Sequence, residues 1–426
     1  MTIAIFLGSL LAAMGAGIPI AFSLLLCGAA LMWHLDMFDA QILAQNVING
    51  ADSFPLLAVP FFMLAGELMN EGGLSRRIVK LAMALVGHVR GGLGYVTIVA
   101  ACLMAALSGS AVADAAALTA LLLPMMVAAG HDKARSAGLL ASASIIAPVI
   151  PPSIGFVIFG VAGGVSISKL FLAGIVPGLV LAVGLWLTWW WLVRRETVAA
   201  PPRASRAEVM TALREATWAM VLPVIVIVGL KFGVFTPTEA AVVAAVYALL
   251  VSTLVYRELQ LSQLYAVFLA AAKTTAVIMF LVAAAMVSAW LITVAQLPAQ
   301  ILALLQPLLD SPKLLMLAIM LLVMLVGTAL DMTPTILLLT PVLIPVVKAA
   351  GIDPVYFGVL FIMNNAIGLI TPPVGTVLNT VAGVGKLRMD AVARGVLPFM
   401  AVQFAVMFLL VAFPQIVTVP ARWLAN

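Results

Sequence analysis

The chain has 426 residues, of which 65% are hydrophobic and 9% are charged. An ordinary soluble domain carries roughly 25% charged residues, so this composition excludes a soluble globular protein. The formal net charge of +5 does not indicate a nucleic-acid partner, because almost all Lys and Arg residues lie in short clusters between long apolar runs. That arrangement is typical of loops on the cytoplasmic side of a bilayer. We therefore expect an all-α polytopic membrane protein.

Ten apolar runs predict spanning helices, each of which needs about 20 apolar residues. They cover about residues 2–18, 20–35, 55–75, 135–162, 170–193, 217–235, 238–256, 276–297, 355–384 and 395–418. Two further runs, at about 92–130 and 313–350, are interrupted near the middle by small and polar residues. Such an interruption is typical of a re-entrant helical hairpin, which turns inside the membrane and leaves by the side it entered.

An internal repeat divides the chain. A shift of 221 residues, without gaps, aligns 118–152 with 339–373, and 12 of these 35 positions are identical. The identities include Pro, Gly and Asp as well as Leu and Ala, which apolar bias alone does not produce. We expect two structural repeats, residues 1–193 and 217–426, joined by a polar cytoplasmic linker at 194–216. A lipid-binding or partner-binding role for this linker stays open.

The charges indicate that the two repeats have inverted topology. The segment after the first hairpin reads GHDKAR, whereas its counterpart after the second reads GIDPVY and has no basic residue. The positive-inside rule then places the first loop in the cytoplasm and the second in the periplasm. Sixteen of the 21 Lys and Arg residues fall on the cytoplasmic side of this arrangement. It predicts a bacterial inner-membrane protein with both termini in the periplasm.

Each repeat contains a Pro-Pro pair that must break a helix. Pro372 and Pro373 lack N–H groups and clash with the preceding turn, so the helix must open around Thr371. Side-chain oxygens gather near this break, from Asn364, Asn365, Thr371, Thr376 and Asn379. The counterpart at residues 141–155 offers Ser142, Ser144 and Ser153. Paired hairpins and broken helices build mid-membrane sites in secondary transporters, and neutral oxygen ligands of this kind suit Na⁺.

Ionisable residues at membrane depth are costly and usually functional. Asp331, beside the second hairpin tip, is the favoured member of a cation site. Asp114 follows the first tip, and its alternative role is to cap or hydrogen-bond the hairpin. For Glu67 a buried structural partner is favoured. Neither the His nor the Cys residues have the spacing of a metal motif, so we expect no cofactor and no enzyme.

Several segments resemble the large membrane subunit of TRAP transporters (tripartite ATP-independent periplasmic transporters, DctM family). They are the SGSAVAD tip, the PPS loop, the LLLTPVLIPVVKAAGIDPVYFG stretch and the LITPPVG loop, and the resemblance covers essentially the whole chain. It implies a sodium-coupled elevator-type importer of a small organic acid, with Na⁺ as the coupling ion. It also implies two partners, a periplasmic substrate-binding protein and a small four-helix membrane subunit, which must here be a separate chain. Two segments look most like members that carry 2,3-diketo-L-gulonate; a C4-dicarboxylate is the other candidate substrate.

The resemblance also implies site residues. One sodium site would join the first tip to the first broken helix, through Ser108, Gly109, Ser110, Ser142, Ser144 and Ser153. The other would join the second tip to the second broken helix, through Gly327, Thr328, Asp331, Asn364, Thr371 and Gly375. Candidate substrate-binding residues are Ser108, Ser110, Thr328, Asn365 and Thr376. Some relatives have Gly near Ser144, so the ligand set there stays open.

Three other classes of protein stay as alternatives. A stand-alone ion-coupled carrier of organic anions would share this architecture without needing a binding protein. A channel fits less well, since hairpins with broken helices suit an occluded site better than a continuous pore. A membrane enzyme subunit would need His pairs, Cys clusters or a nucleotide-binding loop, and the sequence has none of them.

Overall fold

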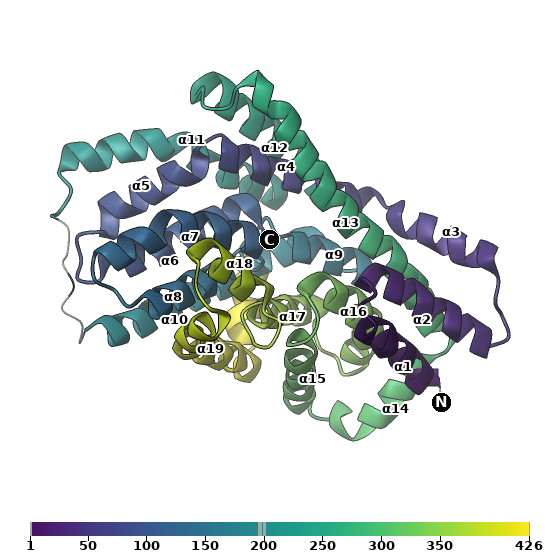
Figure 1. The fold of residues 1–426 in the computed structure, drawn as a ribbon. Helices are drawn as coiled ribbons and strands as arrows, with labels where there is room; N and C mark the ends of the chain where they lie inside the picture. Colours follow the sequence, from purple (N-terminus) through teal and green to yellow (C-terminus); the bar gives the residue numbers. More distant parts are fainter. Residues whose placement is uncertain (1, 195–197, 199–201, 426) are drawn as a thin grey trace.

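The computed structural model describes residues 2–194, 198 and 202–425, and the regular structure in this part of the chain is helical throughout. Figure 1 shows the helices packed as one body, with the long α13 (Leu261–Val294) crossing it diagonally. The expectation of an all-α membrane protein is confirmed: seven of the described helices are long and apolar enough to cross a membrane, and the bent pair α3–α4 makes an eighth. The seven include the second half of each hairpin, Ala111–Ala128 and Met332–Ala349, whereas the first halves, Gly92–Ser108 and Pro312–Gly327, are shorter apolar helices.

The described residues 2–193 form ten α-helices and one 3₁₀ turn. They are α1 (Thr2–Gly15), α2 (Ile20–His34), α3 (Ala40–Ala51), η1 (Phe54–Leu57), α4 (Ala58–Glu71), α5 (Leu74–Val86), α6 (Gly92–Ser108), α7 (Ala111–Ala128), α8 (Lys133–Ser144), α9 (Ile154–Gly163) and α10 (Ile167–Val193).

The second half begins with α11 (Arg206–Lys231), α12 (Pro237–Leu250) and the π-turn η2 (Val251–Val255), which precede α13. It continues through α14 (Leu297–Leu309), α15 (Pro312–Gly327), α16 (Met332–Ala349), α17 (Pro354–Gly368), α18 (Thr376–Gly385), α19 (Met389–Ala412) and α20 (Gln415–Ala425).

The helix bounds follow the 221-residue shift seen in the sequence. The shift carries the bounds of α7 onto those of α16 and places α8, α9 and α10 within a few residues of α17, α18 and α19. Both Pro-Pro pairs, Pro151-Pro152 and Pro372-Pro373, are joined by cis peptide bonds. The two halves differ before their hairpins, because α3 and α4 are bent by 56° where the matching part of α13 is continuous.

Both interrupted runs fold as helix–turn–helix units. The first is α6 and α7, which meet at Ser108-Gly109-Ser110, and the second is α15 and α16, which meet at residues 328–331. Both broken helices are present too, since residues 145–153 separate α8 from α9 and residues 369–375 separate α17 from α18.

The segment expected to be the linker is partly helical, because α11 begins at Arg206. A capping box explains this start: Ser205 Oγ accepts the N–H of Glu208, and the Glu208 carboxylate accepts the N–H of Ser205. The rest of the expected linker includes 195–197 and 199–201, which lie outside the described residues. Just before it, Trp190 and Trp191 are exposed, whereas Trp189 is buried and donates its indole N–H to the Gly91 carbonyl at 2.8 Å.

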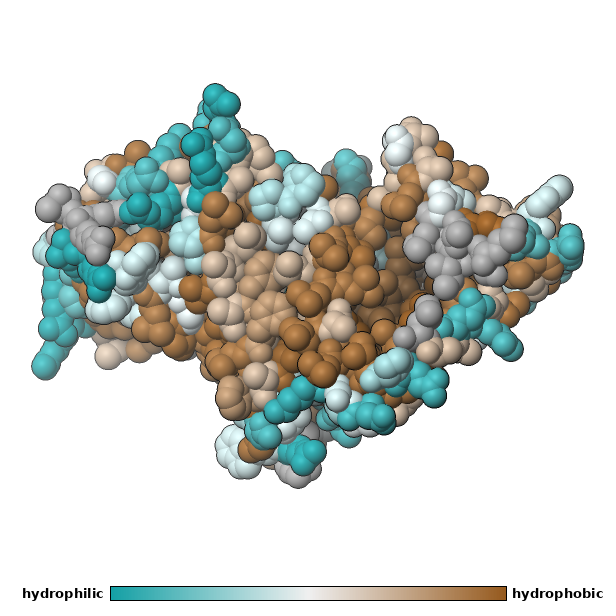
Figure 2. Space-filling view, turned by 90° about the horizontal axis from the view of Figure 1, so that it is seen from below, coloured by the Kyte–Doolittle hydropathy of each residue, from teal (hydrophilic) through white to brown (hydrophobic). Residues whose placement is uncertain are grey.

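The two halves interlock. Helix α4 packs on α12, α8 packs on α19, α7 packs on α18, and α9 packs on α16. Where α8 crosses α19, Gly138 and Gly395 face the opposing backbone so closely that a Cβ on either would overlap it. Figure 2 shows hydrophobic residues gathered across the middle of one face, with hydrophilic residues mainly toward its ends and along its edges. This distribution suits a body surrounded by lipid.

Candidate functional site

The first hairpin tip is a tight turn held by its own side chains. Gly109 has φ +60°, the left-handed region that glycine tolerates best. Ser110 caps α7 by accepting the N–H of Ala113. Ser108 donates its hydroxyl to Asp114 Oδ1 at 2.6 Å, and both residues are buried. Asp114 thus has the alternative role predicted for it, which is to hydrogen-bond the hairpin.

This tip lies against the first Pro-Pro loop. A Cβ on Gly109 would overlap the carbonyl oxygen of Pro152, so the two backbones touch. The loop, residues 145–153, is buried along its whole length. Within it, Ser153 donates its hydroxyl to the Pro148 carbonyl at 2.6 Å and accepts the N–H of Phe156. Ser153 is therefore the cap that restarts the helix as α9.

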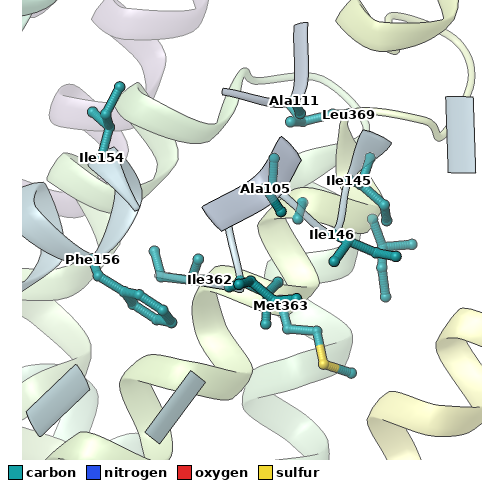
Figure 3. Packing of buried hydrophobic residues seen from close by; sticks show 14 of the residues in the cluster. Ala105, Ala111, Ile145, Ile146, Ile154, Phe156, Ile362, Met363 and Leu369 are labelled. Atoms are coloured by element: carbon teal, nitrogen blue, oxygen red, sulfur yellow. The ribbon is translucent and has the colours of Figure 1, made fainter. Parts of the chain in front are cut away.

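Apolar side chains surround the junction. Figure 3 shows Ala105 at the end of α6 close to Ile146 of the loop and to Ile362 and Met363 of α17. All four side chains are at most 1% exposed. The first tip, the first loop and the second broken helix therefore share one dry core.

The second tip contacts the second broken helix. Thr376, the first residue of α18, donates its hydroxyl to Asp331 Oδ1 at 3.3 Å. Gly327, the last residue of α15, packs against Gly368 at the end of α17, where a Cβ on Gly368 would lie 2.9 Å from the Gly327 carbonyl oxygen. Asn364 of α17 also donates its amide to the Met320 carbonyl of α15 at 2.6 Å.

The loop between α17 and α18 is open. Pro372, Pro373 and Val374 are exposed, as is Asp331. Thr371 continues the preceding helix by donating its hydroxyl to the Ile367 carbonyl at 2.8 Å. Gly375 has φ +43° and begins the turn into α18. The second junction therefore joins the same kinds of elements as the first but is exposed at the surface of the chain.

Unpartnered oxygens mark both broken helices. Asn364 and Asn365 use their amide N–H groups on backbone carbonyls, which leaves both Oδ1 atoms buried without a partner. Ser142 Oγ and Asp114 Oδ2 are also buried and unpartnered. Such atoms are costly in a native structure and need an explanation. Oxygen atoms are the ligands that hard cations prefer, so this donor set fits Na⁺.

The structure brings each tip against a broken helix of its own half, through the contacts of Gly109 with Pro152 and of Asp331 with Thr376. Two further hydroxyls are used locally, like those of Ser153 and Thr371: Ser144 donates to the Leu140 carbonyl and Thr328 to the Leu325 carbonyl. Because each hydroxyl donates its proton to a carbonyl, only the lone pairs of its oxygen remain available to bind a cation. Glu67 lies on α4, where the neighbouring Gly66 faces Ser108 of the first tip.

One residue at the site was not predicted. Gln403 of α19 is fully buried, donates its amide to the Ser142 carbonyl at 2.8 Å, and leaves its own Oε1 unpartnered. The signal in the sequence is a carboxamide in the middle of the apolar run 395–418. Polar residues in spans usually face other protein elements, and this one reaches the other half of the chain.

Residues 7–416 match the family model described as "Tripartite ATP-independent periplasmic transporter, DctM component". The chain belongs to this family. The resemblance seen in the tips and Pro-Pro loops is therefore confirmed. TRAP permeases are transporters and not enzymes, and the described residues hold no group of three or more His, Cys, Asp or Glu side chains that could bind a metal ion.

Three relatives with named substrates show the range of the family. The chain is 57% identical over 424 residues to the 2,3-diketo-L-gulonate TRAP transporter large permease YiaN of Escherichia coli, with 100% of both chains covered. It is 40% identical to the sialic acid permease SiaM of Vibrio cholerae and 37% identical to the C4-dicarboxylate permease DctM of Pseudomonas aeruginosa, each match covering 94% of both chains.

A solved structure shares the fold. The Alcanivorax borkumensis YdaH transporter superposes with a TM-score of 0.64 at 16% identity, covering 88% of this chain and 89% of that one. At this identity the likeness concerns the fold alone. It supports the multi-span helical architecture of this TRAP permease.

Proposed function

We propose that this permease imports a small organic acid together with sodium ions, and that the two tip–loop junctions hold the ions. The observation that carries this proposal is the set of buried, unpartnered oxygens at the broken helices: Asn364 Oδ1, Asn365 Oδ1 and Ser142 Oγ. A protein interior that leaves such atoms without partners provides ready ligands for a cation.

The two junctions supply one ion site each in this proposal. Ser108, Gly109 and Ser110 with the first loop form one site, and Gly327, Thr328 and Asp331 with the second loop form the other. Substrate binds beside them, against the hydroxyls of Ser108, Ser110, Thr328 and Thr376 and the amide of Asn365. The identity to YiaN over the full length favours a sugar acid such as 2,3-diketo-L-gulonate over a C4-dicarboxylate.

The architecture of transport follows from the inverted repeats. Residues 1–193 and 217–426 form the two repeats, and their hairpins and broken helices move together as an elevator against the remaining helices. Both termini lie in the periplasm of an inner-membrane protein. A periplasmic binding protein delivers the substrate, and a separate small four-helix subunit completes the membrane complex.

The experiment is sodium-titrated uptake into proteoliposomes. The permease, its small subunit and its binding protein are assayed together and with each partner omitted, using labelled 2,3-diketo-L-gulonate and then a panel of sugar acids and dicarboxylates. We expect uptake that needs all three proteins and an inward sodium gradient. Robust uptake by the permease alone would instead favour the stand-alone carrier, and uptake unaffected by replacing Na⁺ with K⁺ would contradict sodium coupling.

A further inference from the structure

A cavity of about 320 Å³ lies apart from both tip–loop junctions. One wall comes from α3 and α13, through Asn46, Asn49, Met286, Trp290 and Thr293. The other wall comes from α9 and α16, through Ala162 and Pro341. Its volume is at the lower end of the range found for small-molecule sites, about 300–1,000 Å³.

Two helices, α9 and α16, connect the cavity to the tip–loop junctions. Pro341 follows Asp331 by ten residues on α16, and Ala162 follows Ser153, the N-cap of α9, by nine residues. At 1.5 Å per residue both lie about 14–15 Å along the helix from a tip or loop, which is half of the roughly 30 Å hydrocarbon thickness. In the proposed topology both helices run from mid-membrane to the periplasm, so the cavity is on the periplasmic side.

The lining offers neutral hydrogen-bonding groups. Asn46 uses its amide on the Ile42 carbonyl and keeps its Oδ1 as an acceptor. Thr293 donates to the Ala289 carbonyl and keeps its lone pairs. No hydrogen bond joins the Asn49 side chain or the Trp290 indole N–H to another described residue, so both remain available as donors. A carboxylate needs donors and a polyol needs both kinds of group.

We infer that this cavity is an entry site for hydroxylated organic acids on their way from the periplasm to the tips. The inference rests on the proposed function for the direction of travel. The lining residues carry no charge, so the site binds weakly and releases quickly, as a transit site must. Since one wall belongs to the helices that follow a tip and a loop, movement of those helices changes the shape of the cavity.

The experiment measures how fast a cysteine introduced into the cavity reacts, with and without a bound probe. Thr293→Cys is placed in a background without the two native cysteines, Cys27 and Cys102, and a membrane-impermeant maleimide is added from the periplasmic side. Sodium gluconate, a hydroxylated monocarboxylate, serves as the probe against equal sodium chloride. We expect the introduced thiol to label, and tens of millimolar gluconate to slow labelling by about three-fold or more.

A matched pair of variants localises the protection. Asn49→Leu removes a free donor from the lining and should abolish protection by gluconate. Gln45→Leu removes an equally exposed amide from the same helix outside the lining and should leave protection intact. Failure of the introduced thiol to label, as when lipid chains fill the cavity, would overturn the inference. So would absence of protection, or equal protection in Asn49→Leu. The uptake assay is separate, so failed transport and failed binding at this cavity are distinguishable.

Discussion

The two hairpin tips are built from equivalent parts of the chain but meet different surroundings. At the first, Ser108 and Asp114 are 8% and 1% exposed, and every residue of loop 145–153 is buried. At the second, Asp331 and residues 372–374 are exposed. The N-cap residues diverge as well: Ser110 caps its own helix, whereas the side chain of Asp331 contacts Thr376 across the junction.

This difference in exposure distinguishes two roles that the sequence repeat alone does not distinguish. The first junction is closed by direct backbone contact and by apolar side chains. At the second, a 3.3 Å hydrogen bond joins the exposed Asp331 to Thr376, beside the contact of Gly327 with Gly368. In the proposed mechanism, exchange of ions and substrate with water therefore begins at the second junction.

The largest expected effect comes from a pair of glycine variants. Gly109→Ala forces alanine into the left-handed region, at a cost of about 1–2 kcal/mol, and drives its Cβ into the Pro152 carbonyl oxygen. A displaced tip should lower uptake at least about ten-fold. Gly383→Ala, on α18 of the second half, is the control, because nothing lies within 4 Å of the added Cβ. Uptake by this control variant in proteoliposomes should stay within about two-fold of the wild type. Equal losses of uptake in both variants would contradict the special role of the first tip.

The next effect concerns the exposed carboxylate. Asp331→Asn keeps the shape of the side chain but removes its charge, so we expect half-maximal uptake to need about ten- to a hundred-fold more sodium, which corresponds to about 1.5–3 kcal/mol. Glu67→Gln, on α4, is the control and should shift the sodium curve less. If the sodium curve moves for Glu67→Gln and stays fixed for Asp331→Asn, the carboxylate of the second site has been misassigned.

A smaller effect should appear in stability rather than transport. Ser108→Ala removes the 2.6 Å hydrogen bond to buried Asp114, which should lower the free energy of unfolding by about 1–3 kcal/mol. Thr376→Ala removes the matching bond at the open junction, where water replaces it, and should cost about 0.5 kcal/mol or less. Thermal unfolding of both variants in potassium buffer measures the difference. Equal losses would mean that the two junctions are equally dry.

The smallest functional effect is expected from single cysteines that report accessibility. Val374 is 41% exposed and Ile150 is 7% exposed, although each lies beside a Pro-Pro pair. With Cys27 and Cys102 replaced, Val374→Cys should react quickly with a hydrophilic maleimide, and Ile150→Cys should react at least about ten times more slowly. Both should retain uptake before labelling. Similar rates would remove the distinction between an open and a sealed loop.

Much of this architecture could be predicted from local chemistry. Gly, Ser and Pro interrupt apolar helices for reasons that need no tertiary contact, so both hairpins and both broken helices were located to within a few residues. The start of α11 was missed, although Ser205 and Glu208 have the spacing of a capping box. The short amphipathic helix α5 was also missed, because Arg76, Arg77 and Lys80 interrupt its apolar residues and leave no continuous apolar run.

The features that could not be predicted depend on contacts between elements that lie far apart in the sequence. The contacts of Asn364 with Met320 and of Gln403 with Ser142 join segments 44 and 261 residues apart. Trp189 is buried against Gly91 although its neighbours Trp190 and Trp191 are exposed, and no local pattern distinguishes the three. The burial of one Pro-Pro loop and the exposure of the other is likewise a property of packing, because the Pro-Pro pair that breaks the helix is common to both loops.

The central claim, that Na⁺ binds at the tip–loop junctions, is tested most directly by the stability of the purified chain in sodium. A bound ligand stabilises the folded state by RT ln(1 + [L]/Kd), about 2.7 kcal/mol at a hundred times Kd. Replacing KCl by NaCl at constant ionic strength should raise the unfolding temperature of the wild type with a saturable dependence, and Asp331→Asn should need more sodium for the same rise. Identical unfolding temperatures in NaCl and KCl across the titration would contradict the claim.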